Sequence, residues 1–313
     1  MPTKHLVILN PSSRNGATGR RWRQIEPRLR AKLPDLQVGT TLAPRDAERI
    51  AREGARDGIR RIIVAGGDGT TSEVVTGLLA AGLGGEVEIG FLPLGTGGDF
   101  ARTLAVPRDI DAAIDLLSRA ERRRVDAGRV TYRDRSGAIR TSYFLNVASL
   151  GISGLTDELV NRAPKSLGGT ISFLIGTLRG IVRYRCAHVR LCADGELVHD
   201  GPLILAACAN GRYFGGGMKI APAARVDDGE LDLVVVGQVS KARLIAQLPL
   251  LYRGTHIGHP EVSVQRAKKI EAEAPPGQVW LDVDGEALGT LPATIEVLPG
   301  AITLFGVTGS TEY

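Results

Sequence analysis

The first part of the chain alternates short apolar runs with longer stretches in which apolar residues recur at helical spacing. The runs are continuous rather than alternating, which is typical of strands in a parallel sheet covered on both faces. Strand followed by helix, repeated three times, predicts an N-terminal doubly wound α/β domain. The predicted strands are 6–9, 62–65 and 89–92, and the predicted helices are 20–33, 71–81 and 110–120.

The second part of the chain is rich in short strands and predicts a mostly antiparallel β-sandwich. An arginine-rich run at 122–124 precedes the change of pattern, so we expect domains at 1–128 and 129–298. A last strand, at about 299–313, is expected to return to the first domain. The predicted strands are 143–150, 187–193, 203–209, 231–236, 261–264, 279–283 and 294–297, and the predicted helices are 156–162, 167–183 and 241–251.

Composition narrows the class of protein. The 313 residues are 43% hydrophobic and 23% charged, as in ordinary globular proteins, which argues against disordered and fibrous chains. We expect no signal peptide and no spanning helix, because no uncharged apolar run reaches about 18 residues. Three cysteines without a CxxC pair indicate a reducing cytosol and no zinc site. The net charge of +5 suits phosphorylated molecules and anionic lipids, whereas 4% aromatic residues disfavour nucleic acid.

The sequence Gly66-Gly67-Asp68-Gly69-Thr70 lies between a predicted strand and a predicted helix. Glycines in such a turn let the backbone approach a phosphate, and the helix N-terminus adds amide donors. A carboxylate in the turn would repel phosphate unless a cation lay between them. Asp68 is therefore a candidate for holding Mg²⁺ or for acting as a base, and a plain tight turn is the alternative.

Two further loops are predicted at the same edge of the sheet. Residues 93–100 follow the third strand and offer the Thr96 hydroxyl, and residues 10–13 follow the first strand. Ligands of doubly wound sheets bind outside the carboxyl ends of the strands. Three phosphate-compatible loops at one edge predict a nucleotide site. The P-loop, dinucleotide and protein-kinase motifs are absent from the sequence.

Together, residues 66–70 and 93–102 resemble the catalytic domain of the diacylglycerol and sphingosine kinases, a family that includes soluble bacterial lipid kinases. The resemblance covers nearly the whole chain, in order. Gly98 stands where the family usually has Asn. The 66–70 motif alone is shared with NAD kinases and phosphofructokinases, and the later motifs separate the lipid kinases from both. Those later motifs are 146–151, 210–222, 227–232, 281–286 and 291–292.

The resemblance implies roles for the matched residues. Glu286 would be the general base, although Asp68 could serve the same purpose. A structural Mg²⁺ would be held by the Asp228 carboxylate and by the backbone carbonyls of Arg225 and Glu230, and Asp126 would belong to a Mg²⁺–water network. The residues that would bind ATP are Asn10, Pro11, Ser12, Ser13, Arg14, Thr41, Gly66, Gly67, Asp68, Gly69, Thr70, Thr71, Ser72 and Thr96.

The resemblance therefore implies a cytoplasmic kinase that uses ATP and Mg²⁺ at the inner face of the membrane. Its first expected acceptor is diacylglycerol, converted to phosphatidic acid; other lipid alcohols stay open. The apolar segment 167–182 is either an amphipathic helix that touches the bilayer or a core-packed or dimer-forming helix. Two other functions stay open: an NAD kinase-like enzyme with a soluble substrate, and a lipid-binding regulatory protein without turnover.

Overall fold

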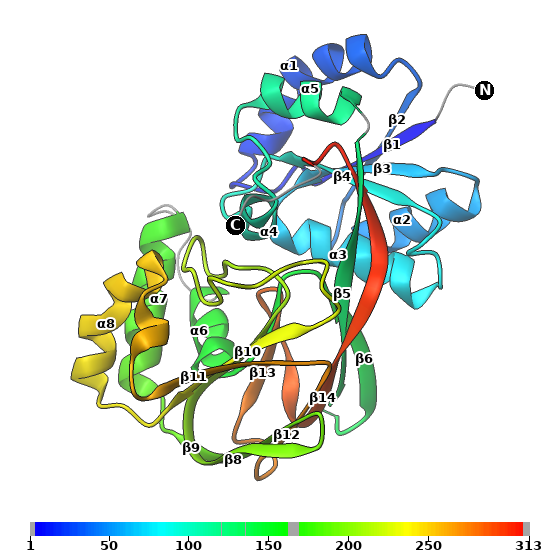
Figure 1. The fold of residues 1–313 in the computed structure, drawn as a ribbon. Coiled ribbons are helices and arrows are strands. Elements are labelled where there is room, and N and C mark those ends of the chain that lie inside the picture. The colour runs from blue at the N-terminus through cyan, green and yellow to red at the C-terminus, as the bar shows by residue number, and fades with distance from the viewer. Residues whose placement is uncertain (1–3, 120, 135, 162–168, 309–313) are drawn as a thin grey trace. The chain divides into compact units, whose positions relative to one another are not determined.

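The computed structural model describes residues 4–119, 121–134, 136–161 and 169–308. The chain forms two compact units, Met1–Asp126 with Gly300–Tyr313 and Ala127–Pro299 (Figure 1). It passes from one unit to the other within β5 (Arg122–Arg133) and again within β14 (Glu286–Phe305). Positions 162, 167 and 168 of the predicted helices, and the end of the predicted last strand at 309–313, lie outside the described residues.

Parallel strands form the centre of the first unit. They lie in the order β2, β1, β3, β4 and β14, and each neighbouring pair is parallel. All five residues of β1 are buried, which explains why this strand is a continuous apolar run in the sequence. The bounds are β1 (His5–Leu9), β2 (Leu36–Thr40), β3 (Arg61–Gly66) and β4 (Glu88–Pro93).

Helices cover both faces of these strands. On one face, α1 (Ala17–Lys32) and α5 (Ile110–Arg119) share a buried cluster with β1, β3 and β4. On the other face, α2 (Asp46–Arg56) packs on β1 so closely that a Cβ on Gly54 would lie 2.6 Å from Leu6 Cδ2. Next to α2 lies α3 (Asp68–Ala80), and the short α4 (Asp99–Thr103) follows β4.

The sequence pattern did not reveal β2 or α2. Only the first residue of β2 is fully buried, so the strand lacks an apolar run. The buried side of α2 consists of Ala47, Ala51 and Ala55, spaced by four residues. Alanine gives a weak hydrophobic signal, and the helix therefore depends on close backbone packing more than on large apolar side chains.

Strands of the second unit are mostly antiparallel, as the sequence predicted. One row runs β11, β10, β9, β7, β13 and β14, and β8 and β12 connect β9 to β14. A cluster of buried apolar side chains fills the interior. The bounds are β6 (Ile139–Phe144), β7 (Val147–Gly151), β8 (Ala187–Ala193), β9 (Glu196–Ala209), β10 (Leu231–Gly237), β11 (Val262–Ala267), β12 (Lys269–Glu273) and β13 (Trp280–Val283).

The described residues of the second unit include three α-helices and a short 3₁₀-helix. They are α6 (Ile152–Asn161), α7 (Gly169–Arg183), α8 (Lys241–Arg253) and η2 (His256–Gly258). None of the helices in the described part of the chain has both the length and the hydropathy to cross a bilayer. The predicted strand 143–150 is in fact two strands, because β6 ends at Phe144 and β7 begins at Val147.

Candidate functional site

Three loops of the first unit meet at the carboxyl ends of β1, β3 and β4. The side-chain amide of Asn10 donates to Thr70 Oγ1 at 3.1 Å, and its backbone N–H donates to the Ala65 carbonyl at 3.1 Å. The backbone N–H of Gly95 donates to the Gly66 carbonyl at 2.8 Å. The turn after β3 is therefore bonded to the loops on both sides of it.

Glycine is required where the loops after β3 and β4 touch. A Cβ on Gly95 would lie 2.3 Å from Gly67 Cα, a separation that no side chain can occupy. Gly69 is different, since it is exposed and a Cβ there would meet nothing within 4 Å. No side chain caps α3, whose N-cap residue is Gly67. The first amides of a helix have no partner within the helix, so this turn can offer them to an anion.

Asp68, the first residue of α3, is held by the loop after β4. Its Oδ2 accepts a hydrogen bond from the Gly98 N–H at 2.8 Å, and its Oδ1 accepts one from the Phe100 N–H at 3.5 Å. Gly98 has φ +66°, in the left-handed region that asparagine tolerates best among residues with a side chain. Because Gly98 acts through its backbone, the contact with Asp68 needs no asparagine side chain.

The residues predicted to bind ATP differ in solvent exposure. Exposed residues can contact a ligand directly, whereas buried ones shape the turns. The exposed ones are Ser12, Arg14, Gly69 and Thr96. The half-buried ones are Asn10, Pro11, Ser13, Gly67 and Asp68. The buried ones are Thr41, Gly66, Thr70, Thr71 and Ser72.

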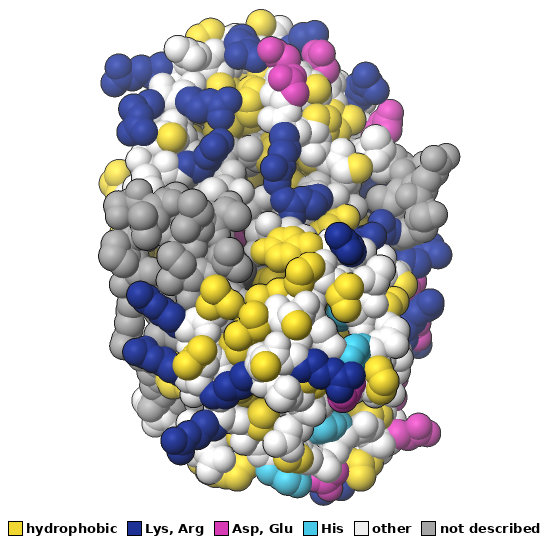
Figure 2. All heavy atoms as spheres, turned by 90° about the vertical axis from the view of Figure 1, so that its left-hand side faces the viewer, with side chains coloured by type: hydrophobic (Ala, Val, Ile, Leu, Met, Phe, Trp, Pro, Cys, Tyr) yellow, Lys and Arg dark blue, Asp and Glu magenta, His cyan; other side chains and the backbone are white. Residues whose placement is uncertain are grey.

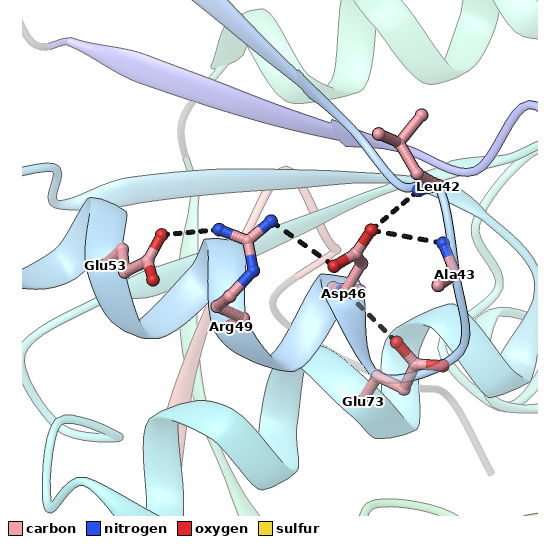
Figure 3. Close-up of polar contacts among 7 residues, drawn as sticks. Leu42, Ala43, Asp46, Arg49, Glu53 and Glu73 are labelled. Carbon is pink, nitrogen blue, oxygen red and sulfur yellow. Dashed lines mark hydrogen bonds and ion pairs between the residues drawn. The ribbon is translucent and has the colours of Figure 1, made fainter.

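Thr41 directly follows β2. Asp46 fixes the two residues after Thr41 (Figure 3). Asp46 Oδ2 accepts hydrogen bonds from the backbone N–H groups of Leu42 at 2.8 Å and Ala43 at 3.1 Å. Arg49 donates to the other carboxylate oxygen at 3.3 Å. The hydrogen bond from Leu42, followed by those from Ala43 and Arg49, lowers the pKa of Asp46 despite an opposing contribution from burial.

Asp126, predicted to belong to a metal network, is buried near the end of the first unit. Its Oδ1 accepts a hydrogen bond from the Gly300 N–H at 2.6 Å. The neighbouring Arg124 donates to the Gly300 carbonyl from Nη2 at 2.7 Å and from Nε at 3.1 Å. Asp126 therefore helps to join β5 and β14 within this unit.

An acidic loop precedes β10 in the second unit. Asp228 Oδ1 accepts a hydrogen bond from the Glu230 N–H at 3.2 Å. Arg266 Nη1 lies 3.9 Å from Asp228 Oδ2 and 3.6 Å from Glu230 Oε2. Burial is the main reason that the pKa of Asp232 is raised to about 6; Arg266 opposes the rise, and the carboxylates of Asp228 and Glu230 contribute to it. Gly229, with φ +75°, permits the turn that brings these carboxylates together.

Glu286 is the first residue of β14, and its side chain is exposed. Val283 and Glu286 are paired, so only Asp284 and Gly285 connect β13 to β14. These two residues have φ +50° and +87°, as a two-residue type I′ hairpin requires. The Asp-Gly sequence is the local signal for this turn, and the turn fixes where Glu286 begins its strand.

The sequence pattern gives Asp284 no role of its own, yet its carboxylate organises the loop between β6 and β7. It accepts hydrogen bonds from the backbone N–H groups of Leu145, Asn146 and Val147, at 3.1, 3.1 and 3.0 Å. This explains why the predicted strand 143–150 is interrupted. Three successive backbone groups in this region turn toward a carboxylate from a distant hairpin.

Asn146 and Asn210 continue this network, and their roles were also missed. The Asn146 carbonyl accepts from the N–H groups of Asn210 and Gly211, both at 2.9 Å, and its side-chain amide donates to the Tyr213 carbonyl at 2.8 Å. The Asn210 side chain donates to the Leu145 carbonyl at 2.7 Å. Both asparagines begin motifs that carried the family resemblance, but nothing in the sequence shows that the two motifs are bonded.

Two family descriptions match the chain in succession. Residues 4–130 match the diacylglycerol kinase catalytic domain, and residues 146–306 match the YegS C-terminal NAD kinase beta sandwich-like domain. The chain therefore belongs to the family of diacylglycerol kinases and YegS-like lipid kinases. Membership of a kinase family implies ATP as the phosphate donor.

Similar proteins match this chain along most of their length. A diacylglycerol kinase of Mycobacterium tuberculosis is 31% identical over 96% of this chain and 94% of that protein. A YegS-like lipid kinase of Chromohalobacter salexigens is 32% identical over 92% of this chain and 89% of that protein. The crystal structure of a diacylglycerol kinase from Bacillus anthracis has a TM-score of 0.75 and 28% identity, covering 96% of each chain.

A more distant likeness concerns the fold alone. Yeast NADH kinase in complex with NADH has a TM-score of 0.53 and 13% identity, covering 99% of this chain and 84% of that chain. Within the described residues, no group of three or more His, Cys, Asp or Glu side chains is arranged to hold a metal ion.

Proposed function

We propose that this chain transfers the γ-phosphoryl group of ATP to the hydroxyl of a membrane lipid, with Mg²⁺, and that the acceptor is diacylglycerol and the product phosphatidic acid. The observation that carries the proposal is the junction of the three loops at the carboxyl edge of the first unit, with Asp68 inside it. The names of the relatives support the choice of acceptor.

The first unit is, in this proposal, a doubly wound nucleotide-binding domain. Its parallel strands carry helices on both faces, and ligands of such sheets bind at the carboxyl edge. The first amides of α3 and the helix dipole stabilise the phosphates. The exposed Ser12, Arg14 and Thr96 donate hydrogen bonds to the nucleotide. The buried residues hold the loops in place, and they are Thr41, Thr70, Thr71 and Ser72.

Two Mg²⁺ roles belong to the proposal. Asp68 would hold the Mg²⁺ that accompanies ATP, with Asp126 in its water network, and the ion would neutralise phosphate charge during transfer. A structural Mg²⁺ fits the acidic loop, because the Asp228 carboxylate and the carbonyls of Arg225 and Glu230 are all oxygen ligands, which Mg²⁺ prefers.

Glu286 is the proposed general base that takes the proton from the lipid hydroxyl. Its exposed carboxylate stands at the start of a strand whose preceding turn is fixed by Asp284, so its backbone position is well defined. Asp68 is the alternative base, because it presents a carboxylate beside the proposed phosphate site. We further propose that the protein acts in the cytoplasm at the inner face of the membrane.

The test is a transfer assay with radiolabelled ATP over a panel of lipids in mixed micelles, with NAD as the control acceptor. The panel contains diacylglycerol, a sphingoid base and phosphatidylglycerol. We expect labelled phosphatidic acid in the presence of Mg²⁺ and none with EDTA. Transfer to NAD but to no lipid would replace this proposal with a nucleotide kinase. Thermal stabilisation by ATP without transfer to any acceptor would indicate a binding protein.

A further inference from the structure

Helix α8 of the second unit carries an apolar stripe on its solvent side. Leu244 and Leu251 pack against a buried cluster of this unit. On the exposed side, Ile245 and Tyr252 have 39% and 44% of their surface accessible, and Pro249 lies exposed between them. Residues three, four and seven apart share one face of a helix, so these three side chains form a continuous stripe.

Neighbouring elements extend this stripe. Helix α8 contacts both α7 and η2. Val182 near the end of α7 is 62% exposed, Ile257 in η2 is 41% exposed, and the Lys241 ammonium donates to the Val182 carbonyl. Viewed from the side of α7 and α8, the lower half of Figure 2 shows apolar side chains gathered among Lys and Arg. We call this the α8 surface, defined by Val182, Ile245, Pro249, Tyr252 and Ile257.

Acidic residues are missing from the chain segments that build this region. Residues 159–193 and 233–260 contain no Asp or Glu, although the whole chain has 34 of them. Arg243 is paired with Glu261 at 2.7 Å, the nearest carboxylate along the chain. The exposed basic residues of α7, α8 and the segment after α7 are Arg179, Arg183, Arg185, Lys241, Arg243 and Arg253. The α8 surface is thus apolar at its centre and cationic around it.

This combination identifies the occupant. A helix with exposed aliphatic and aromatic residues on one face and Lys or Arg around them lies in the interface of an anionic bilayer, where apolar side chains enter the acyl boundary and cations meet the headgroups. A second copy of the chain is a poor occupant, because a two-fold interface would place the cations of this surface opposite one another.

We infer that the α8 surface docks the protein on anionic membranes, with Ile245 and Tyr252 entering the bilayer and Lys241 and Arg253 facing the lipid phosphates. The inference rests on the proposed function, since docking holds the kinase where its lipid acceptor resides. It assigns the contact to α8, η2 and the end of α7, and it does not depend on the predicted amphipathic segment as a whole.

The test is flotation of the full chain with vesicles, without ATP. Vesicles of phosphatidylglycerol and phosphatidylcholine are compared with vesicles of phosphatidylcholine alone. We expect wild type to bind the anionic vesicles and Ile245→Ser/Tyr252→Ser to bind at least about tenfold more weakly, because two apolar anchors are lost. The control is Leu197→Ser, at the start of β9. It removes a side chain as large as that of Ile245 and 54% exposed, and this variant should bind as wild type does.

A charge variant tests the docking independently, because it leaves the apolar side chains of the α8 surface unchanged. Arg253→Glu should weaken binding to anionic vesicles by about fivefold or more, since each basic residue near such a surface contributes about that factor. Lys268→Glu, an exposed site just before β12, is the matched control and should change binding little. Circular dichroism confirms that each variant is folded. Added salt should weaken wild-type binding, because it screens surface charge.

Turnover of a short-chain, monodisperse diacylglycerol separates docking from catalysis. The α8 variants should phosphorylate it at the wild-type rate while losing activity on vesicles. Equal vesicle binding by Ile245→Ser/Tyr252→Ser and Leu197→Ser would overturn docking and leave the proposed function standing. Loss of vesicle binding in a protein that phosphorylates no lipid would support docking and reject the function. A wild-type dimer that the α8 variants dissociate, without change in vesicle binding, would assign this surface to a second copy.

Discussion

The carboxylate of Asp284 accepts a hydrogen bond from the backbone N–H of Asn146 at 3.1 Å, across 138 residues of sequence. The same carboxylate accepts from the residues on either side of Asn146. Asn146 in turn accepts two backbone hydrogen bonds from the segment that begins at Asn210. One hairpin turn therefore holds the segment around Asn146 and, through it, the segment that begins at Asn210, and Glu286 directly follows that turn.

Replacement of Asp284 should cost stability. Asp284→Ala leaves three backbone N–H groups without their acceptor, and we expect a loss of about 3 kcal/mol in the free energy of unfolding. Urea denaturation measures it. Asp194→Ala is the matched control, because Asp194 lies in another Asp-Gly turn and accepts from the exposed N–H groups of Lys268 and Lys269. Its effect should be smaller, since those groups regain water. Equal losses of unfolding free energy in the two variants would contradict this structural role of Asp284.

Asp68→Ala should nearly abolish phosphoryl transfer while the protein stays folded. The carboxylate is held by the loop after β4 beside the proposed phosphate site, and its loss removes the ligand proposed to orient Mg²⁺. The measurements are initial rates and the melting temperature with and without MgATP. Asp111→Ala, in the first turn of α5, removes an exposed carboxylate paired with Arg28 and should leave the rate unchanged. Activity of Asp68→Ala within a few-fold of wild type would reject its role.

Glu286→Gln should keep MgATP binding and lose lipid phosphorylation. The amide retains the shape of the side chain but cannot accept the proton of the lipid hydroxyl. Glu196→Gln is a close control, because Glu196 also follows an Asp-Gly turn and starts an exposed strand end. The readouts are thermal stabilisation by MgATP and turnover. If Glu286→Gln turns over normally, Asp68 becomes the better candidate for the base.

Asp228→Ala should remove the protection that Mg²⁺ gives against heat. A structural ion that binds only the folded state raises the melting temperature with its concentration. The comparison is the Mg²⁺-dependent shift in wild type, in Asp228→Ala and in Asp227→Ala, the adjacent carboxylate that lies 3.9 Å from Arg225. We expect the shift to survive in Asp227→Ala. The same shift in all three proteins would leave the loop as an ordinary acidic turn.

The contribution of Asp46 to stability should disappear in acid. Its pKa is lowered in the folded state, first by the hydrogen bond from Leu42, so its stabilisation is fully present above the unfolded value of 3.8. It is lost as the pH falls through the lower folded pKa. Wild type should therefore be more stable than Asp46→Ala at pH 6, and the difference should shrink as the pH falls below 3.8 and through the folded pKa. A difference that is independent of pH would show that the carboxylate charge plays no part.

Much of the first unit could be predicted because its signals are local. Continuous apolar runs marked β1, β3 and β4, and glycines marked the turns that follow β3 and β4. The strand β2 and the helix α2 could not be found in this way, since β2 has a single buried residue and α2 buries only alanines. The close contact of Gly95 with Gly67 could not be predicted from the sequence either, because it depends on the spacing of two neighbouring strands.

Three copies of one tripeptide show the division most clearly. Asp-Gly-Glu occurs at 194–196, 228–230 and 284–286. The sequence by itself determined the left-handed glycine, which all three copies share. The aspartate is left-handed only at 194 and 284, where the tripeptide forms a hairpin turn.

Only the tertiary structure decided what each aspartate does. Asp194 accepts from the backbone of Lys268 and Lys269, Asp228 lies beside Arg266, and Asp284 holds the segment around Asn146. The tripeptide is the same each time, but a carboxylate binds whichever donors surround it. Packing of the second unit brings different donors to each copy, from residues 38 to 139 positions away.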